Sequence, residues 1–197
     1  MTERAVAGEE KRRQLLDAAV RVFARKGFHA SRVGDIAQEA GVAHGLLYHY
    51  FKSKDQVLEA VFHDNWSILL ARIASVEETD EPAAEQLRHI AAIVLRTWLH
   101  LPDVVRVVVR EFGRSPELAE RIGELAQPIG SIARVIERGI ERGEFKQVDP
   151  RVAATVVYGS IDELLTAWVL DRLPSGEEDV AAAEQTLVEV SLRGLEK

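Results

Sequence analysis

The sequence contains no cysteine and a single methionine, and aromatic residues make up only 6% of its 197 residues. Without cysteine, neither a disulfide framework nor a thiolate metal site can form. No apolar run approaches the length of a membrane span, and the polar N-terminus lacks the apolar segment of a secretory signal. We therefore expect a cytoplasmic protein that has no membrane partner.

The sequence also lacks the common signatures of enzymes. It contains no H-E-x-x-H, no glycine-rich phosphate loop and no G-x-S-x-G. Glu59 and His63, like Glu85 and His89, lie four residues apart, but such a lone pair is far more often a surface contact than a metal site. We expect no catalytic residue, no metal and no cofactor, so the chain is not expected to be an enzyme.

The charge of the chain is unevenly distributed. The formal net charge is −7, but residues 1–56 carry a balance of +3 and residues 57–197 a balance of −10. Binding to a polyanion depends on the local field rather than on the sum over the chain. The asymmetry is modest, and it is compatible with an N-terminal segment that binds nucleic acid.

Residues 31–55, SRVGDIAQEAGVAHGLLYHYFKSKD, are the most informative stretch. They predict two short helices joined at Gly41, with Ser31 as the first cap, and a third helix that starts after Ser53. Two helices joined by such a turn are typical of a helix-turn-helix, which places its second helix in the major groove of DNA. On spacing alone, a helical hairpin without DNA binding remains an equal alternative.

The second of these helices predicts an unusual exposed face. Helical spacing turns Leu47, Tyr50 and Phe51 inward and leaves two histidines, a tyrosine, a leucine and a glycine outside. Tyr and His side chains can donate to phosphate oxygens, a glycine lets the backbone approach closely, and a leucine can touch a thymine methyl group. We expect this face, namely His44, Gly45, Leu46, Tyr48 and His49, to contact DNA.

The start of the third helix adds two lysines. Ser53 and Gln56 fit a capping box, and the free amides of this helix end together with Lys54 would suit a phosphate. Lys52 precedes the cap, and Arg32 precedes the first short helix. We predict that these cations complete the DNA-binding set.

The segment resembles the N-terminal signature of the TetR family of one-component repressors. The matching positions are Ile36, Ala37, Ala40, Gly41, Val42, Gly45, Leu47, Tyr48, Tyr50, Phe51, Ser53, Lys54 and Leu58. Two departures concern the operator sequence rather than the fold: Ala43 stands where the family commonly has a Ser or Thr cap, and Leu46 stands where it commonly has Thr. The resemblance implies a repressor that binds double-stranded DNA.

The remaining sequence predicts an all-α body. Residues 1–55 are the expected DNA-binding domain and 56–197 the expected effector-binding and dimerisation domain, while the first dozen residues are expected to be frayed. Residues 104–112 have strand propensity, yet they lack a partner strand and we predict a helix. Pro128 should kink or divide its helix. The expected helices cover residues 9–26, 54–78, 82–100, 103–112, 116–142, 150–171 and 177–195.

The last two predicted helices suit a homodimer. The helix over 150–171 is apolar on two faces, so one face can pack inward and the other can meet a partner. A palindromic operator requires two reading helices at a fixed spacing, and in the TetR family the last two helices form a four-helix bundle across the dimer. Burial of both faces within one monomer is the alternative.

The body also suggests a small lipophilic effector. Residues 157–163 and 166–169 resemble the branch of the family that controls fatty-acid degradation and responds to acyl-CoA, and arginines recur every four residues at Arg106 and Arg110 and again at Arg134 and Arg138. Arginine suits phosphate, although these arginines could equally pair with neighbouring glutamates on a solvated face. A drug-like or other hydrophobic effector is the competing prediction. The expected effector-binding residues are Trp98, Arg106, Val109, Arg110, Phe112, Arg138, Tyr158, Ile161, Leu165 and Trp168.

Overall fold

The computed structural model describes residues 3–112 and 127–195 of the chain, and these residues are all-α, without a β-strand in either range. The chain divides into two compact units, each described by itself below. Unit 1 comprises residues 1–66 and 106–122, and unit 2 comprises residues 67–105 and 123–197. Unit 1 is thus larger than residues 1–55, because it includes the first part of α4 and the end of α7.

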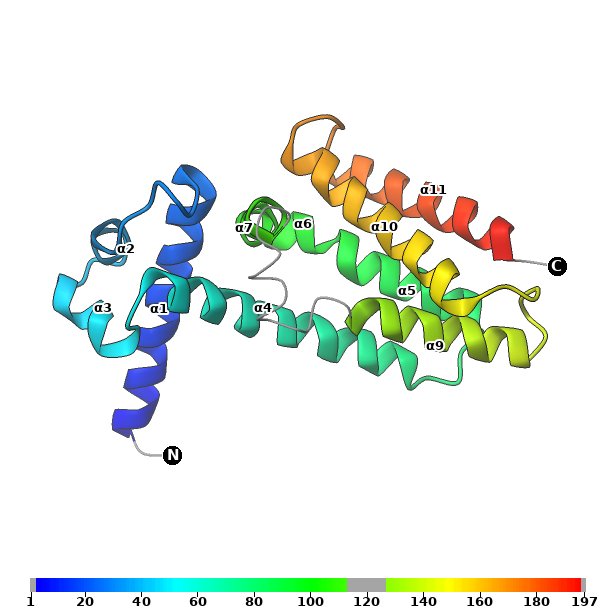
Figure 1. Ribbon diagram of the computed structural model, residues 1–197, viewed down its shortest axis with the longest axis horizontal. Helices are drawn as coiled ribbons and strands as arrows, with labels where there is room; N and C mark the ends of the chain where they lie inside the picture. The colour runs from blue at the N-terminus through cyan, green and yellow to red at the C-terminus, as the bar shows by residue number, and fades with distance from the viewer. Residues whose placement is uncertain (1–2, 113–126, 196–197) are drawn as a thin grey trace. The chain divides into compact units, whose positions relative to one another are not determined.

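Unit 1 is built around the first helix. It contains α1 (Glu3–Lys26), α2 (Val33–Glu39), α3 (His44–Tyr50), the start of α4 (Lys54–Glu77) and the end of α7 (Pro102–Phe112) (Figure 1). The expectation of a frayed N-terminal arm is wrong, since α1 is helical from Glu3, where alanine, glutamate, arginine and lysine favour a helix. The core of this unit includes Leu15, Val22, Phe23, Ile36, Leu47, Phe51, Val57, Leu58 and Val107.

Unit 2 is a packed helical bundle. It contains α5 (Ala83–Leu95), α6 (Thr97–His100), α9 (Gln127–Glu141), α10 (Pro150–Val169) and α11 (Glu177–Leu195), together with the remainder of α4 and α7. Helix α9 packs against α5 and α10, and α11 packs against α5 and α10 (Figure 1). The largest fully buried side chains of this unit include Ile73, Ile90, Leu95, Ile132, Phe145 and Trp168.

Several predicted boundaries need correction. Residues 82–100 form two helices instead of one, because the chain turns at Arg96 and the Thr97 hydroxyl donates to the Ile93 carbonyl at 3.0 Å. Pro128 is the second residue of α9 as described, so the predicted kink or break at Pro128 is not tested. The expected helix before it, residues 116–126, lies outside the described residues. The helix over residues 104–112 is confirmed as part of α7.

The start of α10 is capped by the residue that precedes it. The Asp149 carboxylate accepts hydrogen bonds from the backbone N–H groups of Arg151 and Val152 at 2.9 and 3.0 Å, and Pro150 occupies the first turn. By length and composition α10 could also cross a membrane, a test that core helices of globular proteins pass as well. Its inward residues, among them Ala154, Ile161 and Trp168, are buried in unit 2.

Candidate nucleic-acid interface

The turn between α2 and α3 has the geometry that the sequence predicted. Gly41 takes the left-handed conformation (φ +64°), and the Val42 N–H donates to the Ala37 carbonyl at 3.0 Å. The side chain of Gln14 on α1 donates to the Ala40 carbonyl at 2.8 Å and thereby holds the end of α2. The turn is therefore fixed both by its own backbone and by α1.

The inner and outer faces of α3 follow the predicted pattern with one exception. Leu47 and Phe51 are buried, and Tyr50 packs against the same core. His44, Gly45 and His49 are exposed and Tyr48 is 53% exposed, whereas Leu46 is half-buried. The rings of His44 and Tyr48 stack with their centroids 5.4 Å apart. The outward polar side chains thus form a preorganised surface one helical turn long.

The start of α2 is capped differently from the prediction, whereas the start of α3 agrees with it. Ser31 is not the cap of α2, because its buried hydroxyl donates to the Gly27 carbonyl at 2.6 Å. Arg32 occupies the cap position instead, and its backbone N–H donates to Asp35 Oδ2 at 2.9 Å. At α3, Ala43 supplies no side-chain cap, as its methyl group requires. The side chain of Arg32 is exposed at the start of α2.

Three cations near the end of α1 form ion pairs with carboxylates of α2. Lys26 donates to Asp35 Oδ1 at 2.9 Å, and this contact, together with the Arg32 N–H, lowers the pKa of Asp35 below its ordinary value. Arg21 and Arg25 both bind Glu39 and lower the pKa of its carboxyl. These three cations are therefore engaged with carboxylates on α2.

The start of α4 contains the two predicted lysines in different surroundings. Ser53 Oγ accepts the Gln56 N–H at 3.1 Å, which confirms half of the capping box, while Gln56 Oε1 accepts the Lys52 N–H rather than that of Ser53. The Lys52 side chain is exposed. Lys54 Nζ is half-buried and donates to the carbonyls of Phe28 and Ser31 at 2.6 and 2.9 Å. The Lys54 side chain is therefore directed into the protein.

The predicted effector residues on α7 belong to unit 1. Arg110 donates from Nη1 to the carbonyl of Ala24, in the last turn of α1, at 3.1 Å. Val109 is half-buried, Arg106 has a partner of its own, and the Phe112 side chain lies outside the described part of the structure. Arg110 is thus bound to the end of a helix, where a cation is favoured by the helix dipole.

Five of the other predicted effector residues form the interior of unit 2. The rings of Trp98 and Trp168 lie 6.2 Å apart, and Trp98 Nε1 donates to the Ser175 carbonyl at 3.2 Å. Ile161 is buried, Leu165 is half-buried, and burial with the nearby charge of Asp162 raises the pKa of the half-buried Tyr158 to about 12. The tyrosine therefore keeps its proton and can serve as a neutral hydrogen-bond donor.

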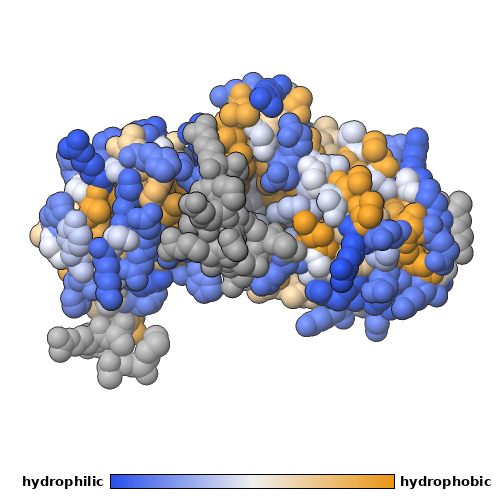
Figure 2. Space-filling view, viewed as in Figure 1, coloured by the Kyte–Doolittle hydropathy of each residue, from blue (hydrophilic) through white to orange (hydrophobic). Residues whose placement is uncertain are grey.

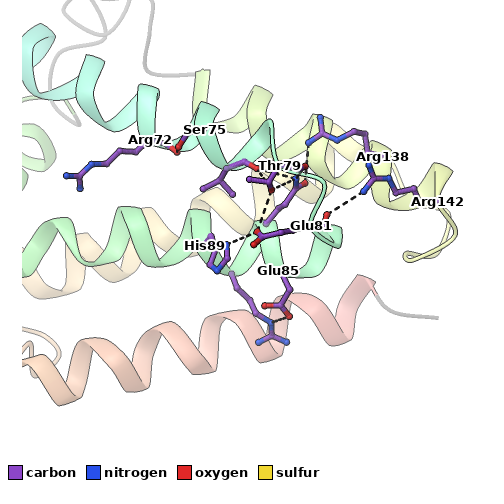
Figure 3. A network of polar contacts seen from close by, with 11 residues as sticks. Arg72, Ser75, Thr79, Glu81, Glu85, His89, Arg138 and Arg142 are labelled. Atoms are coloured by element: carbon purple, nitrogen blue, oxygen red, sulfur yellow. Dashed lines mark hydrogen bonds and ion pairs between the residues drawn. The ribbon is translucent and has the colours of Figure 1, made fainter.

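The arginines of α9 bind the junction between α4 and α5 (Figure 3). Arg138 Nη2 donates to the Glu77 carbonyl at 2.8 Å and to Gln86 Oε1 at 3.2 Å. Arg134 pairs with both carboxylate oxygens of Glu77, which lowers the pKa of Glu77. Arg142, the residue directly after α9, donates to the Glu81 carbonyl at 3.4 Å. The alternative named for these arginines was pairing with neighbouring glutamates, but Arg134 pairs with Glu77, which is 57 residues away in the sequence. Arg138 lies 3.7 Å from the same carboxylate, in addition to its hydrogen bonds with a backbone and an amide oxygen.

Exposed aliphatic side chains lie on α10, on α11 and in the connection between them. Val156 is 62% exposed and Val190 69%, and Val152, Leu170 and Leu173 are also exposed. A groove between the two helices is lined mainly by small and aliphatic residues, including Gly159, Ala183 and Val190, together with threonines, serines and Glu163. Figure 2 shows apolar surface over this part of unit 2. Such a cluster of exposed aliphatic side chains is typical of an interaction surface.

The structural roles of three residues were not expected from the sequence. Gln86 is a buried amide in the polar network of α4, α5 and α9, Glu111 is a buried carboxylate on α7, and Gly139 is a point of close helix packing. The only signal for Gln86 is a polar residue on the apolar side of α5, between Ala83 and Ile90. Glu111 has no such signal for its bond to Phe28, which is 83 residues away, and nothing in the sequence shows that Gly139 packs against Ala83.

Comparisons with known proteins agree on one family. Residues 15–61 match the family of bacterial regulatory proteins of the tetR type, and residues 80–195 match a tetracyclin repressor-like C-terminal domain. The chain is 30% identical over 190 residues to a fatty acid metabolism regulator protein of Bacillus subtilis (strain 168), covering 92% of this chain and 94% of that protein.

Solved structures give the same result. The transcriptional regulator FadR from Bacillus subtilis in complex with stearoyl-CoA has a TM-score of 0.80 at 28% identity, covering 92% of this chain and 97% of that one. The ketosteroid transcriptional regulator KstR2 of Mycobacterium tuberculosis has a TM-score of 0.76 at 25% identity, covering 94% and 95%.

Proposed function

Because the chain belongs to the TetR family of bacterial regulatory proteins, we propose that it binds a palindromic operator as a homodimer and is released from it by a fatty acyl-CoA. Its relatives include transcriptional regulators and an HTH-type transcriptional repressor, which are not enzymes. The observation that carries the DNA part of the proposal is the exposed face of α3, where His44 and Tyr48 stack beside an uncovered Gly45. A regulator that acts on DNA also belongs in the cytoplasm.

The proposed contacts divide into two kinds. Lys52 and Arg32 would bind phosphates, and His44, Tyr48 and His49 would donate to phosphates or bases, while Leu46 would touch a methyl group at a thymine. Gly45 has no side chain, and no neighbouring residue of the described protein lies within 4 Å of the place where a Cβ would stand. A DNA backbone could therefore approach the helix closely at this position. This arrangement suits a helix that lies in the major groove.

The apolar face of α10 and α11 supports the dimer. A twofold axis would place the exposed aliphatic side chains of one copy against the same side chains of the second copy. Val156 and Val190 are more than half exposed in the single chain, and their burial would be favourable by about 25 cal/mol per Å² of apolar area. The same axis would set the distance between the two copies of α3.

The acyl-CoA effector is supported by the similarity to FadR bound to stearoyl-CoA. To shift a repressor almost completely from its DNA-binding state to its released state, a ligand must favour the released state by about 5.5 kcal/mol. At about 25 cal/mol per Å², this corresponds to roughly 220 Å² of apolar surface buried in one state only. A long acyl chain can supply that area. A ketosteroid-type ligand is the second candidate, on the similarity to KstR2.

The operator can be found by selecting protein-bound fragments from a random duplex library. We expect one inverted repeat to be enriched and its binding to fall steeply with salt.

Tyr48→Phe should lower affinity for this operator a few fold, and Tyr48→Ala about tenfold or more, because the alanine loses both the hydroxyl and the stack on His44. Binding without any sequence preference, in a chain that remains folded, would refute the proposal.

The effector is tested by titrating the operator complex with stearoyl-CoA, stearate, free CoA and a ketosteroid. We expect release by stearoyl-CoA at far lower concentration than by stearate or CoA, because only the thioester offers both the apolar chain and the phosphates. Release by the steroid alone would replace the acyl-CoA assignment with the second candidate. Failure of all four ligands would refute a lipophilic effector of either class.

A further inference from the structure

The segment between α1 and α2 is held from two sides within unit 1. Phe28 lies at its centre, buried, with its ring packed edge-on against Phe23 at a centroid distance of 5.3 Å. Its backbone N–H donates to Glu111 Oε1 at 3.2 Å, and its carbonyl accepts from Lys54 Nζ at 2.6 Å. One residue thus connects the end of α7 with the start of α4.

Lys54 makes an unusually complete set of contacts for an ammonium group. Its Nζ lies 2.6 Å from the Phe28 carbonyl oxygen, 2.9 Å from that of Ser31 and 3.4 Å from that of His29, and 4.3 Å from the centre of the Phe28 ring. An ammonium has three N–H donors, so these carbonyls occupy all of them. The aromatic face adds a cation–π contact. No donor remains for a phosphate in this arrangement.

The α7 side is equally specific. Glu111 is 7% exposed, and its carboxylate accepts the backbone N–H of Phe28. Phe28 directly follows Gly27, which ends α1 with a left-handed conformation (φ +80°). The adjacent Arg110 binds the Ala24 carbonyl at 3.1 Å, and Val107 is buried in the same core. Two neighbouring residues therefore recognise the end of α1 by its carbonyl and the following segment by its amide.

We propose that Lys54 and Glu111 are positioning residues for DNA reading, and that Lys54 is not a phosphate ligand. Both act through residues 28–31, which lead directly into α2 and so set the placement of the α2–α3 pair. The proposal rests on the proposed function, because it concerns how the reading helix is held. It assigns the phosphate contact at this end of α4 to the exposed Lys52 instead.

The salt dependence of operator binding separates the two roles. Each phosphate contact contributes about 0.9 to the slope of log K against log [salt]. We expect Lys52→Ala to reduce the slope by about this amount, and Lys54→Ala to lower affinity about tenfold or more with the wild-type slope retained. A slope that falls by about 0.9 in Lys54→Ala would show that Lys54 binds phosphate and would overturn the proposal.

Conservative variants keep the test valid if Lys54→Ala does not fold. Lys54→Gln retains two N–H donors without the charge, so we expect partial recovery of affinity at the wild-type slope. Glu111→Gln retains an acceptor for the Phe28 N–H and should bind DNA nearly as the wild type does, whereas Glu111→Ala should bind more weakly. Equal affinities of Glu111→Ala and the wild type would remove Glu111 from the proposal.

A second measurement needs no DNA. Amide hydrogen exchange of residues 27–32 in the full chain should accelerate in Glu111→Ala and Lys54→Ala, and remain unchanged in Lys52→Ala. Unchanged exchange in both positioning variants would refute the inference even if the protein is a repressor. Absence of operator binding by the wild-type chain would instead refute the proposed function, so the two failures can be told apart.

Discussion

Helices α3 and α9 both carry polar side chains at helical spacing that the sequence offered as ligand contacts, yet the structure treats them differently. On α3, the rings of His44 and Tyr48 stack on each other and stay exposed. On α9, Arg134 and Arg138 bind Glu77 and Gln86. A polar side chain that the fold leaves exposed is available for a partner molecule, whereas one that the fold has bound already has a structural role.

The same distinction applies to glycine. Gly45 on α3 has nothing within 4 Å of an added Cβ, while at Gly139 on α9 a Cβ would lie 2.5 Å from Phe145 Cδ2 and 2.8 Å from Ala83 Cβ. Both glycines lie inside a helix, where glycine costs stability relative to alanine. Close packing explains the one at Gly139. The approach of a ligand is the proposed explanation for the one at Gly45.

The largest expected effect comes from Val156→Glu. This variant tests whether the exposed side chains of α10, like those proposed for α3, contact a partner molecule. A twofold interface would bury this charge twice, at a cost of several kcal/mol. Dimerisation and operator binding should weaken by about 100-fold or more, as measured by sedimentation and gel shift. Ser75→Glu adds the same charge on the exposed surface of α4 and is the control. A fully dimeric Val156→Glu chain would place the interface elsewhere.

The next largest effect is expected from Gly139→Ala, which tests the close packing of Gly139 inside unit 2. The new methyl group would overlap Phe145 and Ala83, and such overpacking costs about 1–3 kcal/mol. We expect a lower melting temperature in calorimetry. Operator affinity at a temperature where the variant is folded should match the wild type. An unchanged or higher melting temperature would mean that this packing is looser than described.

A smaller loss is expected from Arg134→Ala. This substitution removes the bidentate contact with Glu77, and because the Arg134 side chain is 56% exposed, the loss should be only about 0.5–1 kcal/mol at neutral pH. Arg134 lowers the pKa of Glu77 below its ordinary value of 4.5, so the stabilisation is present above that value and is lost as pH falls through the lowered pKa.

The measurement for this pair is urea denaturation of both chains at several pH values. The difference in unfolding free energy between wild type and Arg134→Ala should be full at pH 7 and vanish in the acid range. A difference that stays constant across that range would show that the contact is not a charge interaction. Release of the operator by stearoyl-CoA should be unaffected, because Arg134 is engaged with the protein.

Gly45→Ala should have the smallest effect on stability and the opposite sign. A helical glycine replaced by alanine in open space stabilises by about 0.5–1 kcal/mol. Operator affinity should nevertheless fall a few fold if DNA approaches the backbone there. A variant that is more stable and binds as tightly as the wild type would remove Gly45 from the proposed interface.

Sequence patterns predicted the local features of the reading unit well. Gly41 was placed correctly at a left-handed turn, and Leu47 and Phe51 were placed in the core, because periodicity and turn chemistry act over a few residues. The cap of α2 was wrong because Ser31 bonds back to Gly27. The break at Arg96 was missed because no glycine or proline marks it.

The arginines were harder to interpret. Their spacing alone cannot show that Arg134 meets Glu77, which is 57 residues away, or that Arg110 meets the end of α1, 86 residues away. Nor could the exposed aliphatic side chains of α10 be told apart from its buried ones without knowing what packs beside them. Tertiary packing supplies that information.

By itself, the sequence determined an all-α chain, the helix-turn-helix with its turn and inward face, and the character of the surface of α3, because short-range periodicity and conformational preference settle these. Only the tertiary structure decided which charged and polar side chains are bound within the protein. Lys54 and Glu111 both bind Phe28, which lies 26 residues before Lys54 and 83 residues before Glu111. Contacts between residues so far apart in the sequence depend on how the helices pack.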